Sequence, residues 1–423
     1  MSLRPLKFCM VTTFYPPYFF GGDGMFIYRL SNALAERGHH VAVVHCIDAY
    51  RSVAPRGASP QGNYPHHPNV TVHSLKSRAG ILSPLITQQT GLPGLKASRL
   101  RQILDEGQFD VINYHNMSLM GPAALSYGSG IKLYTMHEHW LVCPMHVLWK
   151  FNRVACDHKH CFACTLHGKR PPQLWRYTGF LDSMLEHIDA FIAVSRFSRQ
   201  KHLDMGLSVS APIEHIPYFV PWPDHAPEPT GDAGTSQPRP YFLFVGRLEK
   251  LKGVQVLIDA FKHYRNADLL IVGDGSYETE VRAQAQGLDH VRFLGRMPYE
   301  RLQALFRDAI ALLVPSVGYE TLGIVILEAL VQRTPVIVHN LGALPEIVEQ
   351  SGGGLIYNNE SELLEALETL RLDTGLRGDL GERGQKACFK YWTPEAHLPQ
   401  YLGLVERIAA QKGVDLRALE KVT

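Results

Sequence analysis

Long apolar runs are missing from this sequence, and their absence excludes one class of protein. No stretch of 18 or more consecutive apolar residues occurs in the 423 residues, so we expect no helix that spans a bilayer. The first residues, Met1–Phe8, are basic, but two prolines soon follow and no small-residue cleavage site is present. The sequence therefore predicts a cytoplasmic protein without a signal peptide.

A charge of one sign is also missing. The chain has 42 Lys and Arg against 40 Asp and Glu, which gives a net charge of +2. This balance argues against nucleic acid as a partner and against a strongly anionic membrane. The sequence contains no strongly basic amphipathic helix, although peripheral contact with a membrane stays open. Hydrophobic residues make up 45% and charged residues 19%, as in ordinary globular proteins.

Cysteine is scarce, with seven in the chain, but four lie within 22 residues of one another. Cys143, Cys156, Cys161 and Cys164 have the spacing C-x12-C-x4-C-x2-C in a segment of about 140–170. Four thiolates suit tetrahedral zinc, so this segment predicts a structural zinc site that pins an inserted loop. An iron–sulfur cluster would use the same ligands and is less expected, and free thiols are the alternative.

The dinucleotide fingerprint G-x-G-x-x-G is absent, yet the first half still alternates strands and helices. Strand Phe8–Thr13, the glycine turn Gly21–Gly24, helix Met25–Arg37 and strand Val41–Cys46 form a βαβ unit. Further strands are expected at Val70–Leu75, Asp110–Tyr114, Lys132–Met136 and Asp189–Ser195, and a helix is expected at Leu95–Glu106. His137 then stands just past a strand, where open α/β sheets place ligands.

A Pro- and Gly-rich linker at 223–240 separates a second α/β series from the first. We therefore expect an N-terminal Rossmann-like domain over 1–222 and a second over 241–393. The helices of 394–423 are expected to return to the first domain. The second series has strands expected at Tyr241–Val245, Asp268–Val272, Val291–Leu294, Ile310–Val314, Val336–Val338 and Leu355–Tyr357.

Two carboxylates eight residues apart, Glu320 and Glu328, flank the start of a helix expected at Leu322–Val331. Gly323 between them lets the backbone approach a ligand. Free N–H groups near Thr321–Gly323 would form an anion site at the helix N-terminus, with carboxylates for hydroxyls on either side. This pattern suits a phosphate beside a polyol. An ordinary loop with two solvated acids is the alternative.

Two cations, Arg247 and Lys252, directly follow the strand Tyr241–Val245. Beside the helix start at Leu322 they would complete a clamp for a diphosphate. As isolated residues they would be solvated surface charges. The carboxylate pair and the glycine turns in the same domain favour the clamp.

Together these motifs resemble family 4 of the retaining glycosyltransferases, which have the GT-B fold. The resemblance covers nearly the whole chain, and its most specific part is E-x7-E at Glu320 and Glu328. It implies an α/β fold of two facing Rossmann-like domains with a central cleft. It also implies transfer of a hexose-type sugar, with retention, from a nucleotide diphosphate donor. A UDP-sugar is the favoured donor.

The resemblance also implies roles for single residues. Glu320 and His137 would contact the donor sugar, and Glu328 the ribose. Arg247 and Lys252 would hold the diphosphate and, with Glu320 and His137, form the catalytic set. The rest of the donor site is expected at Gly22, Gly273, Gly275, Arg296, Met297, Thr321, Leu322 and Gly323.

Some positions depart from the family pattern. Thr321-Leu322-Gly323 stands where the family often has Pro-Phe-Gly, and Glu138 follows His137 where Asp is common. The hinge stretch Ile216–Val220 lacks the usual Asn-Gly, which puts hinge assignments in doubt.

We expect no cofactor at the catalytic centre, because the cations can stabilise the leaving diphosphate. The acceptor would be a hydroxyl on a glycan, a lipid-linked sugar or a small molecule. Two other functions stay open. One is a nucleotide-sugar 2-epimerase of the same fold, and the other is a non-catalytic nucleotide-sugar-binding or scaffold protein.

Overall fold

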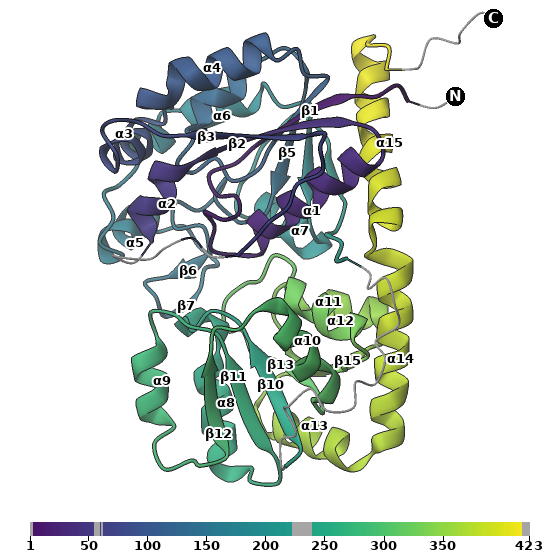
Figure 1. The fold of residues 1–423 in the computed structure, drawn as a ribbon. Coiled ribbons are helices and arrows are strands. Elements are labelled where there is room, and N and C mark those ends of the chain that lie inside the picture. The colour runs from purple at the N-terminus through teal and green to yellow at the C-terminus, as the bar shows by residue number, and fades with distance from the viewer. Residues whose placement is uncertain (1–2, 55–59, 61, 222–238, 417–423) are drawn as a thin grey trace, which may run out of the picture.

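The computed structural model describes residues 3–54, 60, 62–221 and 239–416, and it shows two α/β domains stacked on each other (Figure 1). The N-terminal sheet has seven parallel strands in the order β3-β2-β1-β4-β5-β8-β9. Its strands are β1 (Lys7–Val11), β2 (His40–Cys46), β3 (Val70–Leu75), β4 (Val111–Tyr114), β5 (Ile131–Met136), β8 (Ala190–Ala193) and β9 (Ile213–His215).

The C-terminal sheet has six parallel strands in the order β12-β11-β10-β13-β14-β15. Its strands are β10 (Tyr241–Val245), β11 (Asp268–Val272), β12 (Val291–Gly295), β13 (Leu312–Val314), β14 (Val336–His339) and β15 (Gly354–Tyr357). Both sheets are rich in buried Val, Ile, Leu and Phe, as expected when helices cover both faces of a parallel sheet.

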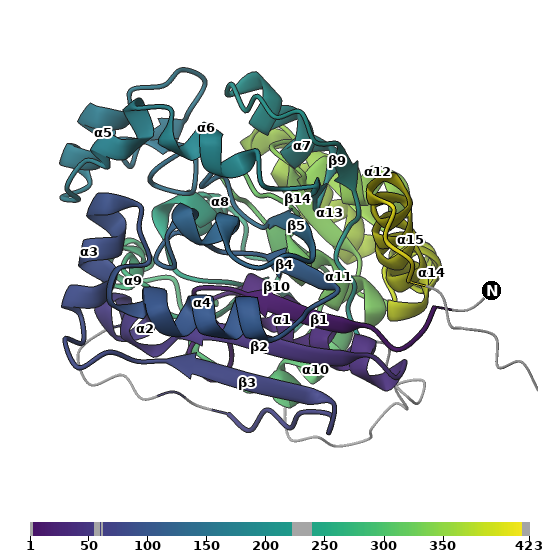
Figure 2. The same ribbon diagram turned by 90° about the horizontal axis from the view of Figure 1, so that it is seen from above.

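Helices flank both sheets (Figures 1 and 2), and a short antiparallel hairpin lies between the domains (Figure 1). The N-terminal domain has α1 (Gly22–Glu36), α2 (Ile47–Val53), α3 (Leu82–Thr90), η1 (Gly94–Lys96), α4 (Ala97–Glu106), η2 (Pro122–Ser126), β6 (Trp149–Lys150), β7 (Val154–Ala155), α5 (Cys161–His167), η3 (Leu174–Tyr177), α6 (Phe180–Leu185) and α7 (Arg196–Asp204). The second part of the chain has η4 (Lys250–Lys252), α8 (Val254–His263), α9 (Glu278–Gln284), α10 (Tyr299–Asp308), α11 (Ile324–Val331), α12 (Leu344–Ser351), α13 (Glu360–Leu372), α14 (Thr374–Tyr391) and α15 (Pro394–Lys412).

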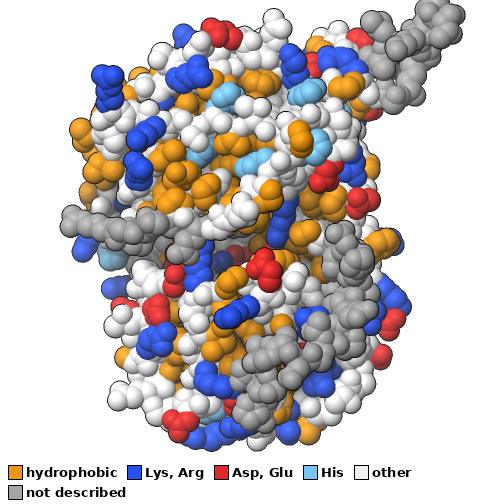
Figure 3. Space-filling model, in the orientation of Figure 1, with side chains coloured by type: hydrophobic (Ala, Val, Ile, Leu, Met, Phe, Trp, Pro, Cys, Tyr) orange, Lys and Arg blue, Asp and Glu red, His pale blue; other side chains and the backbone are white. Residues whose placement is uncertain are grey.

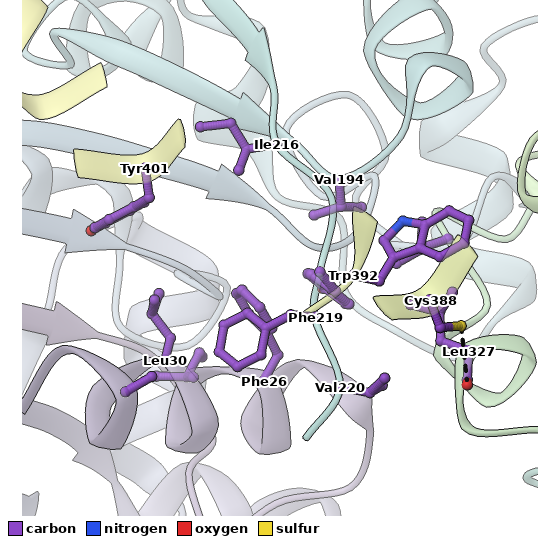
Figure 4. Packing of buried hydrophobic residues seen from close by; sticks show 14 of the residues in the cluster. Phe26, Leu30, Val194, Ile216, Phe219, Val220, Leu327, Cys388, Trp392 and Tyr401 are labelled. Carbon is purple, nitrogen blue, oxygen red and sulfur yellow. Dashed lines mark hydrogen bonds between the residues drawn. The ribbon is translucent and has the colours of Figure 1, made fainter. Parts of the chain in front are cut away.

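The largest apolar cluster joins the two domains. It combines one face of the first sheet with residues of α1, α11, α14 and α15. Figure 4 shows Phe26 of α1 beside Phe219, and Trp392 between the domains. Separate clusters fill the outer faces of the first and second sheets. The shared cluster keeps the domains together along one side.

The last helix, α15, leaves the second domain and packs on the first. Tyr401 on α15 accepts a hydrogen bond from Asn113 of β4 at 3.1 Å, and His397 donates to the carbonyl of Pro217 at 2.7 Å. Close to the start of α15 the Val220 N–H donates to the Trp392 carbonyl at 3.0 Å. Both crossings of the chain between the domains therefore lie side by side.

Most of the expected elements form, with shifted ends. The helix predicted to begin at Leu322 begins at Ile324, because Gly323 adopts a left-handed conformation at its N-cap (φ 90°). The helix predicted from Leu95 begins at Ala97, after the 3-10 turn η1. Of the predicted linker, 223–238 lie outside the described residues. None of the helices described here has the length and apolar content to cross a bilayer.

Candidate active site

In both sheets the chain reverses its direction of winding beside the central strand, and polar residues gather there. In the second sheet β10 and β13 are neighbours, so the loops after them meet. Arg247 and Lys252 follow β10, and Glu320 follows β13. In the first sheet β1 and β4 are neighbours, and Asp23 and Asn116 follow them. Such switch points are where open α/β sheets bind ligands.

Glu320 is held by two partners from its own domain. Lys252 Nζ donates to its two carboxylate oxygens at 2.7 and 2.9 Å, and the Ser316 hydroxyl donates to one of them at 2.7 Å. Burial opposes ionisation of Glu320, but Lys252 and Ser316 together hold its pKa below the ordinary value. The carboxyl group is therefore an anion at neutral pH.

Glycine makes the approach of these two loops possible. Gly253 has φ +75°, and a Cβ at this position would lie 1.9 Å from the carbonyl oxygen of Pro315. Only glycine avoids that collision and tolerates that backbone conformation. Gly253 thus brings Lys252 against the loop that carries Glu320.

Two helix N-termini face each other across the domain boundary. Gly22 begins α1, and a Cβ there would lie 3.1 Å from Cγ2 of Ile324, the first residue of α11. Thr321, just before α11, donates through its hydroxyl to the His137 carbonyl at 2.8 Å, and its own backbone carbonyl accepts from the Ser195 hydroxyl at 2.6 Å. Neither helix start has a side-chain N-cap hydrogen bond, and the positive ends of the two helix dipoles favour an anion between them.

Glu328 pairs with a residue that the sequence analysis missed. Arg29 of α1 reaches across the boundary to its carboxylate at 3.3 Å, and the side chains are only 11% and 14% exposed. Burial raises the pKa of Glu328, and Arg29 opposes that rise. The second terminal nitrogen of Arg29 has no hydrogen-bond partner among the described residues. The carboxylate predicted to bind a ribose is thus bridged to the other domain.

His137 is buried, and both of its ring nitrogens have protein partners. One lies 2.8 Å from Nδ1 of His115, and the other is hydrogen-bonded to the Tyr218 hydroxyl. Burial lowers the pKa of His137 to about 3, so the ring is neutral at physiological pH. In this arrangement the backbone carbonyl faces Thr321, and the contact of the ring with a donor sugar stays a prediction.

Gly273 and Gly275 have a packing role that the sequence did not indicate. A Cβ at Gly273 would lie 1.9 Å from the carbonyl oxygen of Gly246, and one at Gly275 would lie 2.3 Å from that of Leu248. Both glycines therefore allow the loop after β11 to lie against the loop that carries Arg247. Their contact with a donor stays a prediction.

The remaining predicted donor residues differ in their surroundings. Arg247 is 49% exposed and pairs with Glu249. Arg296 is exposed, whereas Met297 packs against the apolar cluster between the domains. The side chain of Leu322 is buried in that same cluster, so only its backbone can face a ligand.

Two further acids, Asp23 and Glu138, belong to the first domain, and Asp23 interacts with Arg247 of the second domain. Burial and the neighbouring Glu138 raise the pKa of Asp23, while the Gly24 N–H, Asn116 and Arg247 oppose that rise. Glu138 accepts a hydrogen bond from His146 at 2.6 Å, and its other oxygen has no partner in the described structure. In the sequence, Asp23 lies in the glycine turn and Glu138 directly follows His137, and these positions could have indicated that both acids belong to the site.

The four clustered cysteines line one small cavity together with His160 and Met205. All four thiols are free. Within the described parts of the chain, however, no three His, Cys, Asp or Glu side chains form a group that could hold a metal ion. The zinc site, and the iron–sulfur alternative, therefore stay predictions from spacing.

Comparison with known families decides the classification. Residues 20–221 match the family model described as Glycosyltransferase Family 4, and residues 231–387 match Glycosyl transferases group 1. The two matches fall on the two domains whose facing loops form the site. The protein is a family 4-type glycosyltransferase with the GT-B fold.

The chain is similar to known proteins that have different named activities. It is 28% identical to a phosphatidyl-myo-inositol mannosyltransferase of Mycobacterium leprae, over 74% of this chain and 77% of that protein. It is 25% identical to an alpha-maltose-1-phosphate synthase of Mycolicibacterium smegmatis, over 96% of this chain and all of that protein.

Solved structures of other proteins share the two-domain GT-B fold of this glycosyltransferase. Sucrose-phosphate synthase from Thermosynechococcus elongatus superposes with a TM-score of 0.72 at 20% identity, covering 96% of this chain and all of the other. HepE of Anabaena, solved in complex with UDP, gives 0.68 at 17% identity, covering 95% and 100%. At these identities the likeness concerns the fold.

Proposed function

We propose that this glycosyltransferase moves a hexose-type sugar from a UDP-sugar to a hydroxyl acceptor, with retention of configuration. The observation that carries the proposal is the Glu320–Lys252 pair. It lies at the switch point of the second sheet, next to the start of α11, where the start of α1 at Gly22 faces it. A carboxylate, cations and the starts of two helices then converge on one place, as a sugar diphosphate requires.

The donor would lie along the loops of the second domain. Its diphosphate would meet Lys252, Arg247 and the N–H groups before Ile324, its sugar Glu320, and its ribose Glu328. Binding would replace the present pairs of Lys252 and Arg29, so the donor exchanges one set of charged partners for another. A solved relative in complex with UDP-glucose supports this class of donor.

The transfer follows from these positions. The bond between the sugar C1 and the diphosphate oxygen breaks, and the acceptor oxygen bonds to C1 from the same face. The acceptor proton passes to an oxygen of the leaving diphosphate. Lys252 and Arg247 stabilise the negative charge that develops there, so the reacting centre needs no metal ion. Glu320 positions the sugar and stabilises its positive charge in the transition state.

A thermal-shift screen with UDP, GDP, ADP and their hexoses tests the donor. A ligand that binds the native state raises the melting temperature by mass action, so UDP-hexoses should give the largest rise. Proton NMR of the product should then show the anomeric configuration of the donor. A rise with none of the nucleotides contradicts the proposal. Conversion of the donor to an epimer without acceptor would favour the epimerase instead.

A further inference from the structure

Tyr319, the residue before Glu320, belongs to the second domain but packs against the first. Its hydroxyl donates to the Asp157 carboxylate at 2.9 Å. Its ring packs against the apolar cluster on the outer face of the first sheet, and the ring centroid of Phe197 of α7 lies 5.3 Å from its own. The Tyr319 side chain therefore crosses the boundary between the domains, which lies across the middle of the molecule in Figures 1 and 3.

Lys201 of α7 contacts both partners of this hydrogen bond. Its ammonium lies 3.5 Å from the Asp157 carboxylate and 4.4 Å from the centre of the Tyr319 ring. The Lys201 side chain is only 12% exposed, so its attraction to the ring is stronger than at a fully hydrated position. One buried cation of the first domain thus holds the aromatic ring and the acid that bind each other.

Asp157 belongs to the segment that carries the four clustered cysteines. It directly follows Cys156, after the hairpin of β6 and β7. Trp149 of β6 lies against the same loop of the second domain, because a Cβ at Gly318 would lie 3.5 Å from Cε3 of Trp149. The inserted segment therefore contacts the loop that carries Glu320 at two neighbouring residues, Gly318 and Tyr319.

The residue on the other side of Glu320 is also bound to the first domain. The Thr321 hydroxyl donates to the His137 carbonyl, and the Thr321 carbonyl accepts from the Ser195 hydroxyl. The carboxylate of Glu320 is held within its own domain, whereas the backbone on both sides of it is held by the first domain. The position of this carboxylate therefore depends on contacts that both domains make.

We propose that Tyr319 is a positioning residue of the sugar transfer, and that the cysteine-containing segment acts on the reaction through it. Its contacts with Asp157 and Lys201 fix the backbone of Glu320 where the carboxylate meets the donor sugar. A displacement of about 1 Å can lower a rate about 100-fold, so a small shift of this backbone is enough to slow the transfer. The inference rests on the proposed role of Glu320.

Tyr319→Phe tests the inference, because it keeps the ring over Lys201 and removes only the hydrogen bond to Asp157. With the donor found in the thermal-shift screen, we expect kcat to fall about tenfold and the dissociation constant of the donor to stay unchanged. The melting temperature should also change little, since the Asp157 side chain is 70% exposed. Initial rates and titration calorimetry measure these quantities.

A double-mutant cycle assigns the loss to this one hydrogen bond. Asp157→Ala should lower kcat by about the same factor as Tyr319→Phe, and the double variant should be no slower than either, because all three lack the same bond. Losses that multiply in the double variant would show that the two side chains act separately, and would overturn the inference.

Tyr264→Phe is the matched control, since its hydroxyl donates to the Glu368 carboxylate at 3.0 Å within the second domain. Its kcat should equal that of the wild type. Glu320→Gln is measured in the same assay. A slow Glu320→Gln together with a wild-type kcat in Tyr319→Phe overturns this inference and leaves the proposed function intact. A fully active Glu320→Gln overturns both.

Discussion

Glu320 keeps its charge in a buried position because Lys252 and Ser316 both donate to its carboxylate. Glu320→Gln keeps the shape and much of the bonding but removes the charge. We expect this variant to fold, and its kcat/KM to fall at least ~100-fold, equivalent to about 3 kcal/mol of transition-state stabilisation. Initial rates with a donor identified by the screen would measure it.

The control for this variant is Glu278→Gln, which removes a carboxylate from an exposed pair with Arg282 on the same domain. Its kcat/KM should equal that of the wild type. Alanine at Glu320 or Lys252 is less informative, because it leaves the partner charge buried and unpaired. Wild-type kcat/KM in a folded Glu320→Gln would show that the carboxylate has no role in the reaction.

The bridge between Arg29 and Glu328 predicts a pH effect on nucleotide binding. Burial raises the pKa of Glu328 and Arg29 opposes that rise, so Arg29→Gln should raise this pKa further. Glu328 will then protonate at a higher pH than in the wild type. If its carboxylate binds ribose hydroxyls, UDP affinity should fall more steeply in Arg29→Gln between pH 8 and 5.5. Titration calorimetry at both pH values measures this difference.

Arg407→Gln is a suitable control for the same titration, since Arg407 of α15 forms an exposed ion pair with Glu214 of β9 and does not contact Glu328. It should show the wild-type pH dependence. An identical pH dependence in Arg29→Gln would mean that Glu328 does not contribute its charge to nucleotide binding.

At the level of elements, the turn before α8 is the most sensitive to substitution. Gly253→Ala would place a methyl group 1.9 Å from the Pro315 carbonyl oxygen, in a backbone conformation with φ +75°. We expect a loss of more than about 2 kcal/mol in the free energy of unfolding, because the turn must move. Urea denaturation would measure the loss.

Gly287→Ala separates the steric effect from the backbone effect. Gly287 also has a positive φ, of +81°, but no atom lies within 4 Å of its added Cβ. Its substitution should cost only about 1 kcal/mol. Equal losses in the two variants would show that the contact with Pro315 is unimportant.

The strands could be predicted from the sequence more fully than the inserted helices. Buried parallel strands read as short apolar runs, and Tyr241–Val245 and Asp268–Val272 form where they were predicted. Helix α3 was not predicted, because Leu82, Leu85 and Ile86 face solvent whereas Ser83 and Thr87 are buried. A pattern read from periodicity cannot tell which side of such a helix is buried.

The residues of the candidate site could also be predicted only in part, because some of their contacts join residues far apart in the sequence. Motif spacing indicated Glu320, Glu328, Arg247 and Lys252, and the structure brings Glu320 and Lys252 into contact. Arg29 could not be predicted, because it lies 299 residues from Glu328 and on the other domain. Its partner depends on how the two domains pack, which local sequence does not encode.

For the whole molecule, buried neutral histidines predict sensitivity to acid. Burial lowers the pKa of His137 to about 3 and those of His45 and His397 to about 4, against 6.5 in an exposed histidine. Between these values the unfolded chain binds more protons than the native protein, so stability falls as the pH falls below 6.5. At pH 5 each histidine should cost about 2 kcal/mol of the free energy of unfolding.

Urea denaturation at pH 7.5, 6 and 5 would measure this slope. His397→Gln removes one of the titrating groups, so its stability should decrease less between pH 7.5 and 5 than that of the wild type. His263→Gln, in the last turn of α8 and exposed, is the control and should keep the wild-type slope. A wild-type stability independent of pH over this range would contradict the prediction.

The hydrogen bond between Val220 and Trp392 has a mechanical consequence. The two segments that connect the domains run side by side at this point, so the domains cannot slide apart or twist freely there. Their relative motion is confined largely to rotation about an axis through this joint. Displacement then grows with distance from the axis. Helix α3, on the side of the first domain away from α15, would travel farther than residues beside α15 for the same angle of opening.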